Sequence, residues 1–239
     1  TRSGDYANLR DVPRPSHADY PAYVKFGAAH DIRGGGHFSG RLTAPLCIAG
    51  GIALQMLKTR GVSIGAHIAS VGSVNDARFD AVNVSTSDFD KIAANGFPVL
   101  DWQAGEKMLA EIECARADAD SIGGTIECAA VGLPAGLGDA LFGGLEGRMS
   151  MALFGVPAVK GVEFGNGFDC ATLRGSQNND PFVIENGKIK TLTNNAGGIL
   201  GGITTGMPLI FKVAIKPTPS IGKPQQSVSL SRMENSELV

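Results

Sequence analysis

Glycine is the feature of this sequence that most constrains how the chain can fold. The chain has 33 glycines in 239 residues, about twice the usual share of roughly 7%. Glycine has no Cβ atom and therefore lets one backbone segment approach another, or a ligand, closely. Because aromatic residues make up only 6% of the chain, we expect a close-packed fold of small side chains with such backbone approaches.

The overall composition indicates a globular protein. Hydrophobic residues make up 43% and charged residues 18% of the chain, which permits a sizeable core and excludes global disorder. We find no linker long enough to divide the chain and expect one domain over residues 1–239. The formal net charge of −2 gives no sign of a nucleic-acid or membrane-surface binder.

The cysteines and the N-terminus indicate a reducing, cytoplasmic location. The four cysteines are far apart and form no C-x-x-C pair, so we expect no metal site and buried free thiols. The first residues, 1–5, lack the pattern of a signal or transit peptide. No apolar run reaches about 18 residues, so we expect no membrane-spanning helix.

The charges are unevenly distributed along the chain. Residues 88–127 include nine acidic and three basic residues, whereas residues 188–233 include six basic residues and no acidic one. Such a basic stretch is either a solvated face or a site for a small anion such as phosphate or carboxylate. The sequence leaves both interpretations open.

The pattern of apolar residues predicts a mixed fold. We expect an ordered loop over residues 1–38 and a buried central helix over 43–60. Further helices are expected at 87–95, 105–119 and 139–154, strands at 62–68, 122–131, 158–164 and 207–216, and a hairpin around Asn186-Gly187. Strands and helices do not alternate regularly, so the predicted class is α+β, with antiparallel sheets packed on buried helices.

The common sequence signatures of catalytic and nucleotide-binding sites are either in the wrong structural context or absent from this sequence. Residues 61–65 match G-x-S-x-G, but a nucleophile serine must follow a strand and precede a helix. Here the predicted helix comes first and the strand follows, which excludes a serine hydrolase. No Walker A spacing occurs, and no G-x-G-x-x-G lies between a strand and a helix.

Three other segments have residues suited to binding or proton transfer. Residues 14–20 read Arg-Pro-Ser-His-Ala-Asp-Tyr and combine a guanidinium with an imidazole that titrates near neutral pH. Residues 33–44 place three glycines before a predicted helix start, where free N–H groups suit an anion. Glycine-rich residues 194–203 and the segment Lys216-Pro-Thr-Pro-Ser220 form the third group. Each segment also has a purely structural explanation.

Taken together, these segments resemble the chorismate synthase family. Residues 157–163 (Pro-Ala-Val-Lys-Gly-Val-Glu) and 174–180 (Arg-Gly-Ser-Gln-Asn-Asn-Asp) extend the resemblance, which covers the chain from Thr1 to Val239. The resemblance implies a β–α–β sandwich, with antiparallel sheets packed on central helices, in a homotetramer. It also implies a carbon–oxygen lyase of the shikimate pathway. Such enzymes convert 5-enolpyruvylshikimate 3-phosphate to chorismate and phosphate by 1,4-anti elimination, with reduced FMN and no net oxidation.

The resemblance also assigns roles to residues of this chain. It implies that His17 is catalytic and that Arg14, Ser39 and Arg41 contact the substrate. The expected flavin contacts are His37, Phe38, Ser39, Pro157, Ala158, Gly201, Lys216, Pro217, Thr218, Pro219 and Ser220. His37 and Phe38 replace the arginine and serine of many family members. NADPH is expected to act only indirectly, by reducing the flavin.

The resemblance places this chain in the central part of the family sequence. The family's earlier Gly-Glu-Ser-His-Gly motif and later Arg-His-Asp-Pro motif are not in these 239 residues. We therefore expect the chain alone to be inactive. Two other readings are open: a non-catalytic core that binds FMN or another anion, and an NADPH-dependent flavin reductase.

Overall fold

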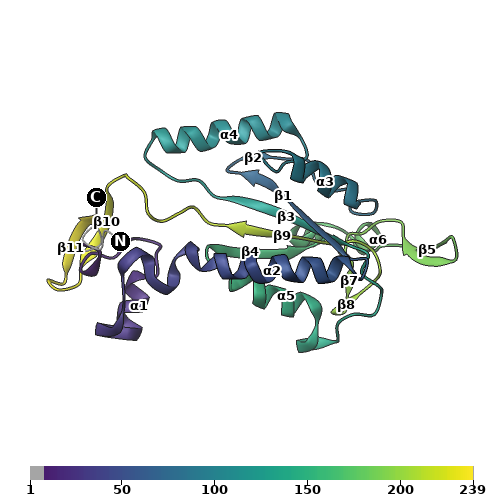
Figure 1. The fold of residues 1–239 in the computed structure, drawn as a ribbon, viewed down its shortest axis with the longest axis horizontal. Coiled ribbons are helices and arrows are strands. Elements are labelled where there is room, and N and C mark those ends of the chain that lie inside the picture. The colour runs from purple at the N-terminus through teal and green to yellow at the C-terminus, as the bar shows by residue number, and fades with distance from the viewer. Residues whose placement is uncertain (1–7, 239) are drawn as a thin grey trace.

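A five-stranded antiparallel sheet forms the centre of the molecule (Figure 1). The computed structural model describes residues 8–238; the N-terminal segment examined for a leader pattern lies outside them. The strand order is β2-β1-β3-β9-β4. The strands are β1 (Ser63–Val71), β2 (Val74–Asn75), β3 (Gly124–Val131), β4 (Val159–Phe164) and β9 (Leu209–Ile215).

Helices pack on both faces of this sheet. Helix α3 (Thr86–Ala94) covers one face, where Phe89 belongs to the same buried cluster as Ile210 of β9. Helix α5 (Leu145–Phe154) covers the opposite face, where its Met149 packs with Phe211, the next residue along β9. Helix α4 (Trp102–Ala117) adds Met108 to a third cluster with Val71 and Val99. The predicted α+β class is therefore confirmed.

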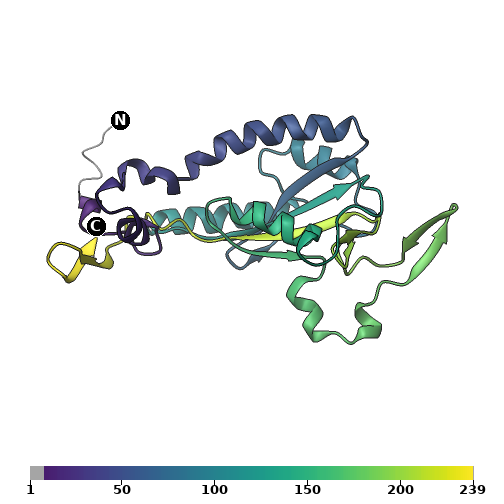
Figure 2. The same ribbon diagram turned by 90° about the horizontal axis from the view of Figure 1, so that it is seen from below.

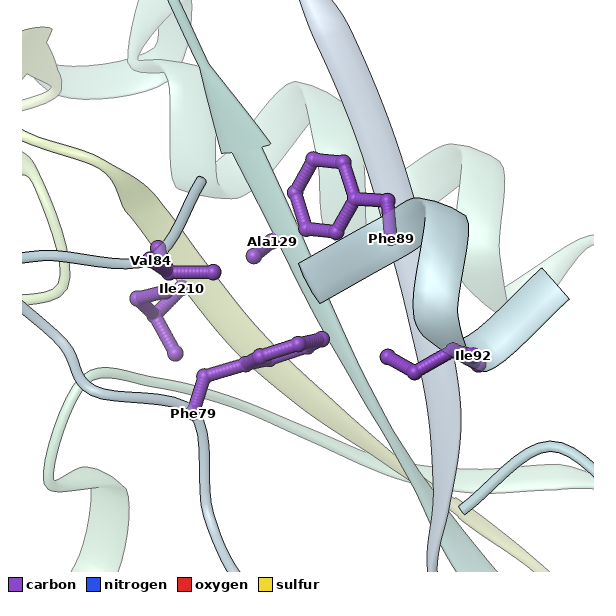
Figure 3. Close-up of a cluster of buried hydrophobic side chains, with 6 residues drawn as sticks. All are labelled: Phe79, Val84, Phe89, Ile92, Ala129 and Ile210. Atoms are coloured by element: carbon purple, nitrogen blue, oxygen red, sulfur yellow. The ribbon is translucent and has the colours of Figure 1, made fainter. Parts of the chain in front are cut away.

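Close packing against glycine is clearest where α3 meets the sheet. Phe79, Val84, Phe89, Ile92, Ala129 and Ile210 form the cluster shown in Figure 3. A Cβ atom built on Gly65 of β1 would lie 2.1 Å from Cδ1 of Phe89. Only glycine at this position lets the ring lie directly on the strand. This is the kind of approach that the glycine content predicted.

A buried polar cluster lies beside the same core. The His67 side chain is fully buried, with Nδ1 2.8 Å from Oδ2 of Asp76 and Nε2 3.0 Å from Oε2 of Glu127. The Phe79 ring meets the imidazole edge-on at 4.8 Å between centroids. The backbone N–H groups of Leu100 and Asp101 donate to the two oxygens of Asp76. The cluster thus ties two loops to the sheet, and the sequence analysis did not predict it.

The predicted elements are largely present, with shifted ends. Helix α3 begins at a capping box formed by Ser85 and Asp88, and Asp101 caps α4. The helix expected from 139 begins only at Leu145, after a 3₁₀ turn at Leu141–Gly143. The expected loop over 1–38 was wrong in part, because it includes helix α1 (Asp19–Phe26) and 3₁₀ turns at Asn8–Arg10, Gly27–Ala29 and Arg33–Phe38.

Helix α2 (Thr43–Lys58) differs most from the prediction. We expected a buried central helix, but none of its residues is buried, and Ile48 is 68% exposed. Figure 2 shows α2 running along the outside of the molecule. With the preceding turn, residues 40–58 are also long and apolar enough to cross a membrane by length and composition alone. The run-length argument therefore did not exclude a spanning helix, although one such helix is weak evidence for a membrane protein.

Three two-stranded ladders complete the described part of the chain. The predicted Asn186-Gly187 hairpin is confirmed between β5 (Phe182–Glu185) and β6 (Lys188–Thr191), with positive φ at both turn residues. The other elements were not predicted: α6 (Gly175–Asn178), β7 (Ile199–Leu200), β8 (Ile203–Thr204), β10 (Gln225–Ser229) and β11 (Glu234–Leu238). The second large sheet implied by the resemblance is not formed by residues 8–238.

The cysteines are free thiols, as expected, but they are not buried as a group. Cys47, Cys114 and Cys170 are exposed, and Cys128 is partly buried. Burial raises the pKa of the Cys128 thiol to about 12, with a smaller contribution from Glu127. The expectation of buried thiols was therefore wrong for three of the four. Their small neighbours in the sequence belong to helix and loop surfaces rather than to the core.

Candidate active site

A cavity of about 580 Å³ lies where four segments of the chain meet. This volume is within the range of small-molecule sites, roughly 300–1,000 Å³. Most of the residues that sequence analysis assigned to the site line this cavity: Arg14, His17, His37, Phe38, Ser39, Pro157, Ala158, Lys216, Thr218, Pro219 and Ser220. The fold thus brings together residues that are up to 206 positions apart.

The first wall is a tight turn over residues 14–17. The His17 N–H donates to the Arg14 carbonyl at 3.3 Å. Pro15 presets the second position, and Ser16 takes the third with a φ of 60°, as a type II turn requires. Lys216 donates from Nζ to the Ser16 carbonyl and so joins this turn to the end of β9.

Asp19 holds the two functional side chains of this turn. It is only 3% exposed and accepts hydrogen bonds from Arg14 Nε (2.8 Å) and Arg14 Nη2 (3.0 Å). Its Oδ1 also lies 2.6 Å from Nδ1 of His17. Burial by itself would raise the pKa of Asp19, but the hydrogen bonds from His17 and Arg14 outweigh it and hold the pKa well below its usual value. Asp19 is therefore an ionised acceptor.

The glycine-rich segment forms the second wall and needs its glycines. Gly35 has a φ of +81°, and a Cβ there would lie 3.7 Å from Nε2 of His17. At Gly36, which has a φ of +51°, a Cβ would lie 2.4 Å from the Asp31 carbonyl oxygen. A side chain at Gly36 would therefore break the 3₁₀ turn that supports this wall.

The third wall joins the end of α5 to the start of β4. Phe154, Gly155 and Val156 line it together with Pro157 and Ala158. Ala158 has a φ of 71°, a conformation that costs an L-residue about 1–2 kcal/mol. The Lys216 N–H donates to the Ala158 carbonyl at 3.0 Å, which fixes this strained residue beside the end of β9. Strained residues of this kind are concentrated at functional sites.

The fourth wall is the segment Lys216–Ser220. Arg14 Nη1 donates to Oγ of Ser220 at 3.0 Å, and Ser121 Oγ donates to the Thr218 carbonyl at 2.7 Å. Pro217 points elsewhere: its Cδ would lie 2.9 Å from a Cβ on Gly123. Pro217 therefore anchors the segment and does not line the cavity.

The cavity has a positive lining. Its described lining residues include Arg14, His17, His37 and Lys216, and no Asp or Glu. Elsewhere in the basic stretch, carboxylates pair with Lys190, Lys212, Lys223 and Arg232. Lys216 differs, because the hydrogen bond shown for its ammonium group goes to a carbonyl oxygen. An anion in the cavity would thus meet a cation not neutralised by a carboxylate in the described part of the chain.

Besides Pro217, two assigned residues, Arg41 and Gly201, lie outside the cavity lining. Arg41 donates from Nε to Ser39 Oγ at 3.2 Å and is exposed at the margin of the cavity. Gly201 is farther away, in the turn between β7 and β8, where Gly202 accepts from the Leu145 N–H at the start of α5. The cavity lies at the other end of this ten-residue helix, about 15 Å along its axis. Within one chain, Gly201 does not join the other assigned residues.

Sequence reasoning missed several residues of the site. Asp19 was part of a quoted motif, and its spacing from His17 was the available signal. Gly35 was noted only as part of a glycine run. For Phe154, Gly155, Val156 and Val159 no sequence signal pointed to the cavity, because their place in it depends on how α5 packs on the sheet.

Comparison with known proteins agrees with this geometry. The chain matches the family model described as "Chorismate synthase" over residues 1–239. It is 47% identical to the chorismate synthase of Lancefieldella parvula over 100% of this chain, and 50% identical to that of Thermococcus gammatolerans over 99%. A solved structure titled "Crystal Structure of Chorismate Synthase" superposes with a TM-score of 0.76 and 30% identity over 82% of this chain.

The chain is shorter than these proteins. It spans 65% of the Lancefieldella protein, 64% of the Thermococcus protein and 61% of the chain in the solved structure. The similarity nevertheless covers all four segments that form the cavity, because the family match extends from residue 1 to residue 239.

Proposed function

The chain belongs to the chorismate synthase family, and on this basis we propose that the full-length protein is a lyase that converts 5-enolpyruvylshikimate 3-phosphate to chorismate and phosphate. The supporting observation is the cavity itself. Four separate segments bring Arg14, His17, Ser39 and Lys216 to one place of suitable size. The substrate carries phosphate and carboxylate groups, which match the positive lining.

The residues of the cavity fit a flavin mononucleotide. The hydroxyls of Ser39, Thr218 and Ser220 and the ammonium group of Lys216 are suitable donors to a phosphate and to ring oxygens. A Cβ atom built on Gly35 would lie 3.7 Å from Nε2 of His17, so glycine at this position keeps the cavity side of the imidazole free of a side chain. Phe38, Pro157 and Ala158 supply apolar surface. When bound, reduced FMN supplies electron density that eases the departure of phosphate, without net oxidation.

We assign His17 the proton-handling role. Its Nδ1 is engaged by Asp19, whereas Nε2 lies on the cavity side beside Gly35. A group that transfers a proton at this position by general acid–base catalysis contributes about 10²–10⁴-fold to a rate. Asp19 and Ser220 hold the guanidinium of Arg14 in place, and the N–H groups that these contacts leave on Nη1 and Nη2 suit a substrate anion. Arg41 serves the same purpose from the margin of the cavity.

We further propose that the protein acts in the cytoplasm as a homotetramer and that NADPH contributes only by reducing the flavin. The exposed apolar residues of α2, such as Ile48 and Met56, support assembly or coverage by further chain. No dinucleotide-binding fingerprint supports a flavin reductase activity of its own.

Chorismate formation with reduced FMN tests the proposal in a full-length protein that carries this chain. We expect turnover in that protein and at least a 10²-fold lower turnover in its His17→Ala variant, with little change in FMN binding. His30→Ala is the matched control, because His30 lies only 13 positions after His17 but does not line this cavity. Oxidation of NADPH by FMN without chorismate would favour a flavin reductase, and FMN binding without either reaction would favour a non-catalytic core.

A further inference from the structure

We propose that Asp19 is a positioning residue, which places the proton of His17 on Nδ1 and directs Nε2 into the cavity. Asp19 does not line this cavity and has no assigned role among the site residues. The catalytic consequence rests on the proposed function, whereas the protonation pattern of the ring follows from the hydrogen bonds alone.

The hydrogen bonds around Asp19 leave one arrangement of protons. Oδ1 of Asp19 lies 2.6 Å from Nδ1 of His17, so one of the two atoms must donate. An ionised carboxylate only accepts, and the pKa of Asp19 is held well below its usual value by its hydrogen bonds from His17 and Arg14, which outweigh burial. The proton of this short bond is therefore on Nδ1 of His17.

Arg14 is consistent with this arrangement. Its Nη2 lies 3.2 Å from Nδ1 of His17 and 3.0 Å from Oδ1 of Asp19. A guanidinium has donors only, so it cannot form a hydrogen bond to an Nδ1 that already has its proton. Nη2 therefore donates to Asp19, and its approach to the imidazole is a contact. Oδ1 of Asp19 thus accepts from both groups.

The other ring nitrogen is left for the cavity. Nε2 of His17 lies 3.7 Å from the Cβ position of Gly35, on the wall opposite Asp19. The charged or titratable groups around His17 are Asp19 and Arg14 from its own segment, His37 from the glycine-rich wall and Lys216 from the end of β9. Lys216 reaches the neighbouring Ser16 carbonyl. Nε2 of the neutral ring is thus able to take a proton from a bound ligand, and the imidazolium formed can give that proton back from the same atom.

Replacing Asp19 by asparagine should move the proton of the neutral His17 ring from Nδ1 to Nε2. The site of Oδ2 receives two Arg14 donors, the backbone N–H at 3.1 Å and Nε at 2.8 Å. The site of Oδ1 receives only one Arg14 donor, Nη2 at 3.0 Å, so the single amide oxygen belongs at the Oδ2 site, which turns the amide NH₂ toward Nδ1 of His17. Nδ1 must then accept, and the proton of the neutral ring moves to Nε2. In the Ser-His-Asp triad the same exchange lowers kcat by about 10⁴ through the wrong tautomer.

Nuclear magnetic resonance of ring-¹⁵N-labelled histidine tests the proton position directly. The chain has four histidines, and a His17→Gln variant assigns the relevant signal. In the full-length protein we expect the neutral His17 ring to be protonated at Nδ1, and in Asp19→Asn at Nε2. Asp31→Asn is the matched control, since Asp31 accepts from the backbone N–H, Nε and Nη2 of Arg33 in the same way without contacting His17.

The activity measurement then separates this inference from the proposed function. We expect kcat to fall by about 10²–10⁴-fold in Asp19→Asn, with a changed pH profile, and to be unchanged in Asp31→Asn. If the wild-type protein forms no chorismate, the proposed function fails while the resonance data still decide the proton position. A wild-type ring protonated at Nε2 overturns the inference even if the variant does not fold. A proton that moves to Nε2 in Asp19→Asn without loss of kcat also overturns the inference.

Discussion

The buried cluster of His67, Asp76 and Glu127 should respond unequally to two nearly identical substitutions. Asp76→Asn and Glu127→Gln each replace a buried carboxyl group by an amide of the same shape. The side chain of Asp76 is completely buried and that of Glu127 is 4% exposed, so burial does not separate them. The two residues differ in how many of their carboxyl oxygens accept hydrogen bonds.

Asp76 uses both of its oxygens. Oδ1 accepts from the N–H groups of Ala77 and Asp101, each at 2.8 Å. Oδ2 accepts from Leu100 at 2.6 Å and lies 2.8 Å from Nδ1 of His67. An amide has one oxygen, and with that oxygen at the Oδ1 site the Leu100 N–H must face the NH₂ group, whereas Nδ1 of His67 can become an acceptor by moving its proton to Nε2. At roughly 1–3 kcal/mol for a buried donor left without an acceptor, Asp76→Asn should cost about 1–3 kcal/mol.

Glu127 uses one oxygen for the hydrogen bonds shown. Its Oε2 accepts from the Phe79 N–H at 2.8 Å and lies 3.0 Å from Nε2 of His67. The amide oxygen of Glu127→Gln can occupy the same place, so the cost should be below about 1 kcal/mol. Removing the imidazole in His67→Ala leaves both carboxyl groups without it and should cost about 3–5 kcal/mol.

Thermal unfolding at one fixed protein concentration measures this order. For a chain of this size 1 kcal/mol corresponds to roughly 2–4 °C in Tm, so we expect a fall of about 2–12 °C for Asp76→Asn and a smaller fall, less than about 4 °C, for Glu127→Gln. His37→Ala, an exposed imidazole, controls for loss of a histidine. An equal or larger Tm loss in Glu127→Gln would refute the hydrogen-bond assignment, because it would show that charge and not donor pairing governs the cluster.

Three further predictions concern the site and the isolated chain. Arg41→Lys keeps the charge but loses the paired geometry, so we expect weaker substrate binding and a smaller change for FMN; equal losses for both ligands in titrations would show that Arg41 is misassigned. The 239-residue chain alone should bind FMN no more than weakly and release no phosphate from the substrate, which an assay on material of confirmed intact mass checks, and its exposed α2 should promote self-association in sedimentation. Finally, the pKa of Asp19 is lowered in the folded chain, so the stability that its ion pair gives the fold is complete above the unfolded pKa of about 3.9 and is lost as the pH falls below that value. Limited proteolysis should therefore cut residues 14–26 faster at pH 3 than at pH 5. Equal rates would contradict the ion pair.

Local patterns in the sequence determined much of the secondary structure. The capping box at Ser85 and Asp88 and the Asn186-Gly187 turn act over a few residues, so their sequence alone predicts α3 and the β5–β6 hairpin. The motif Arg14-Pro-Ser-His17 likewise determines its own turn. The resemblance to a known family identified most of the residues that line the cavity, although composition and spacing left each of them with a structural alternative.

Burial and long-range placement were decided by the tertiary structure. Helix α2 has the composition of a core helix, yet none of its residues is buried in the described part of the chain, because burial depends on what packs against a helix and not on the helix itself. Gly201 and Lys216 are only 15 positions apart, but the turn of β7–β8 and the length of β9 place them at different ends of the sheet. Asp19 was visible in the sequence, and only the folded turn shows which nitrogen of His17 it engages. Hydrogen bonds of this kind depend on distances of a few tenths of an ångström, which residue spacing does not specify.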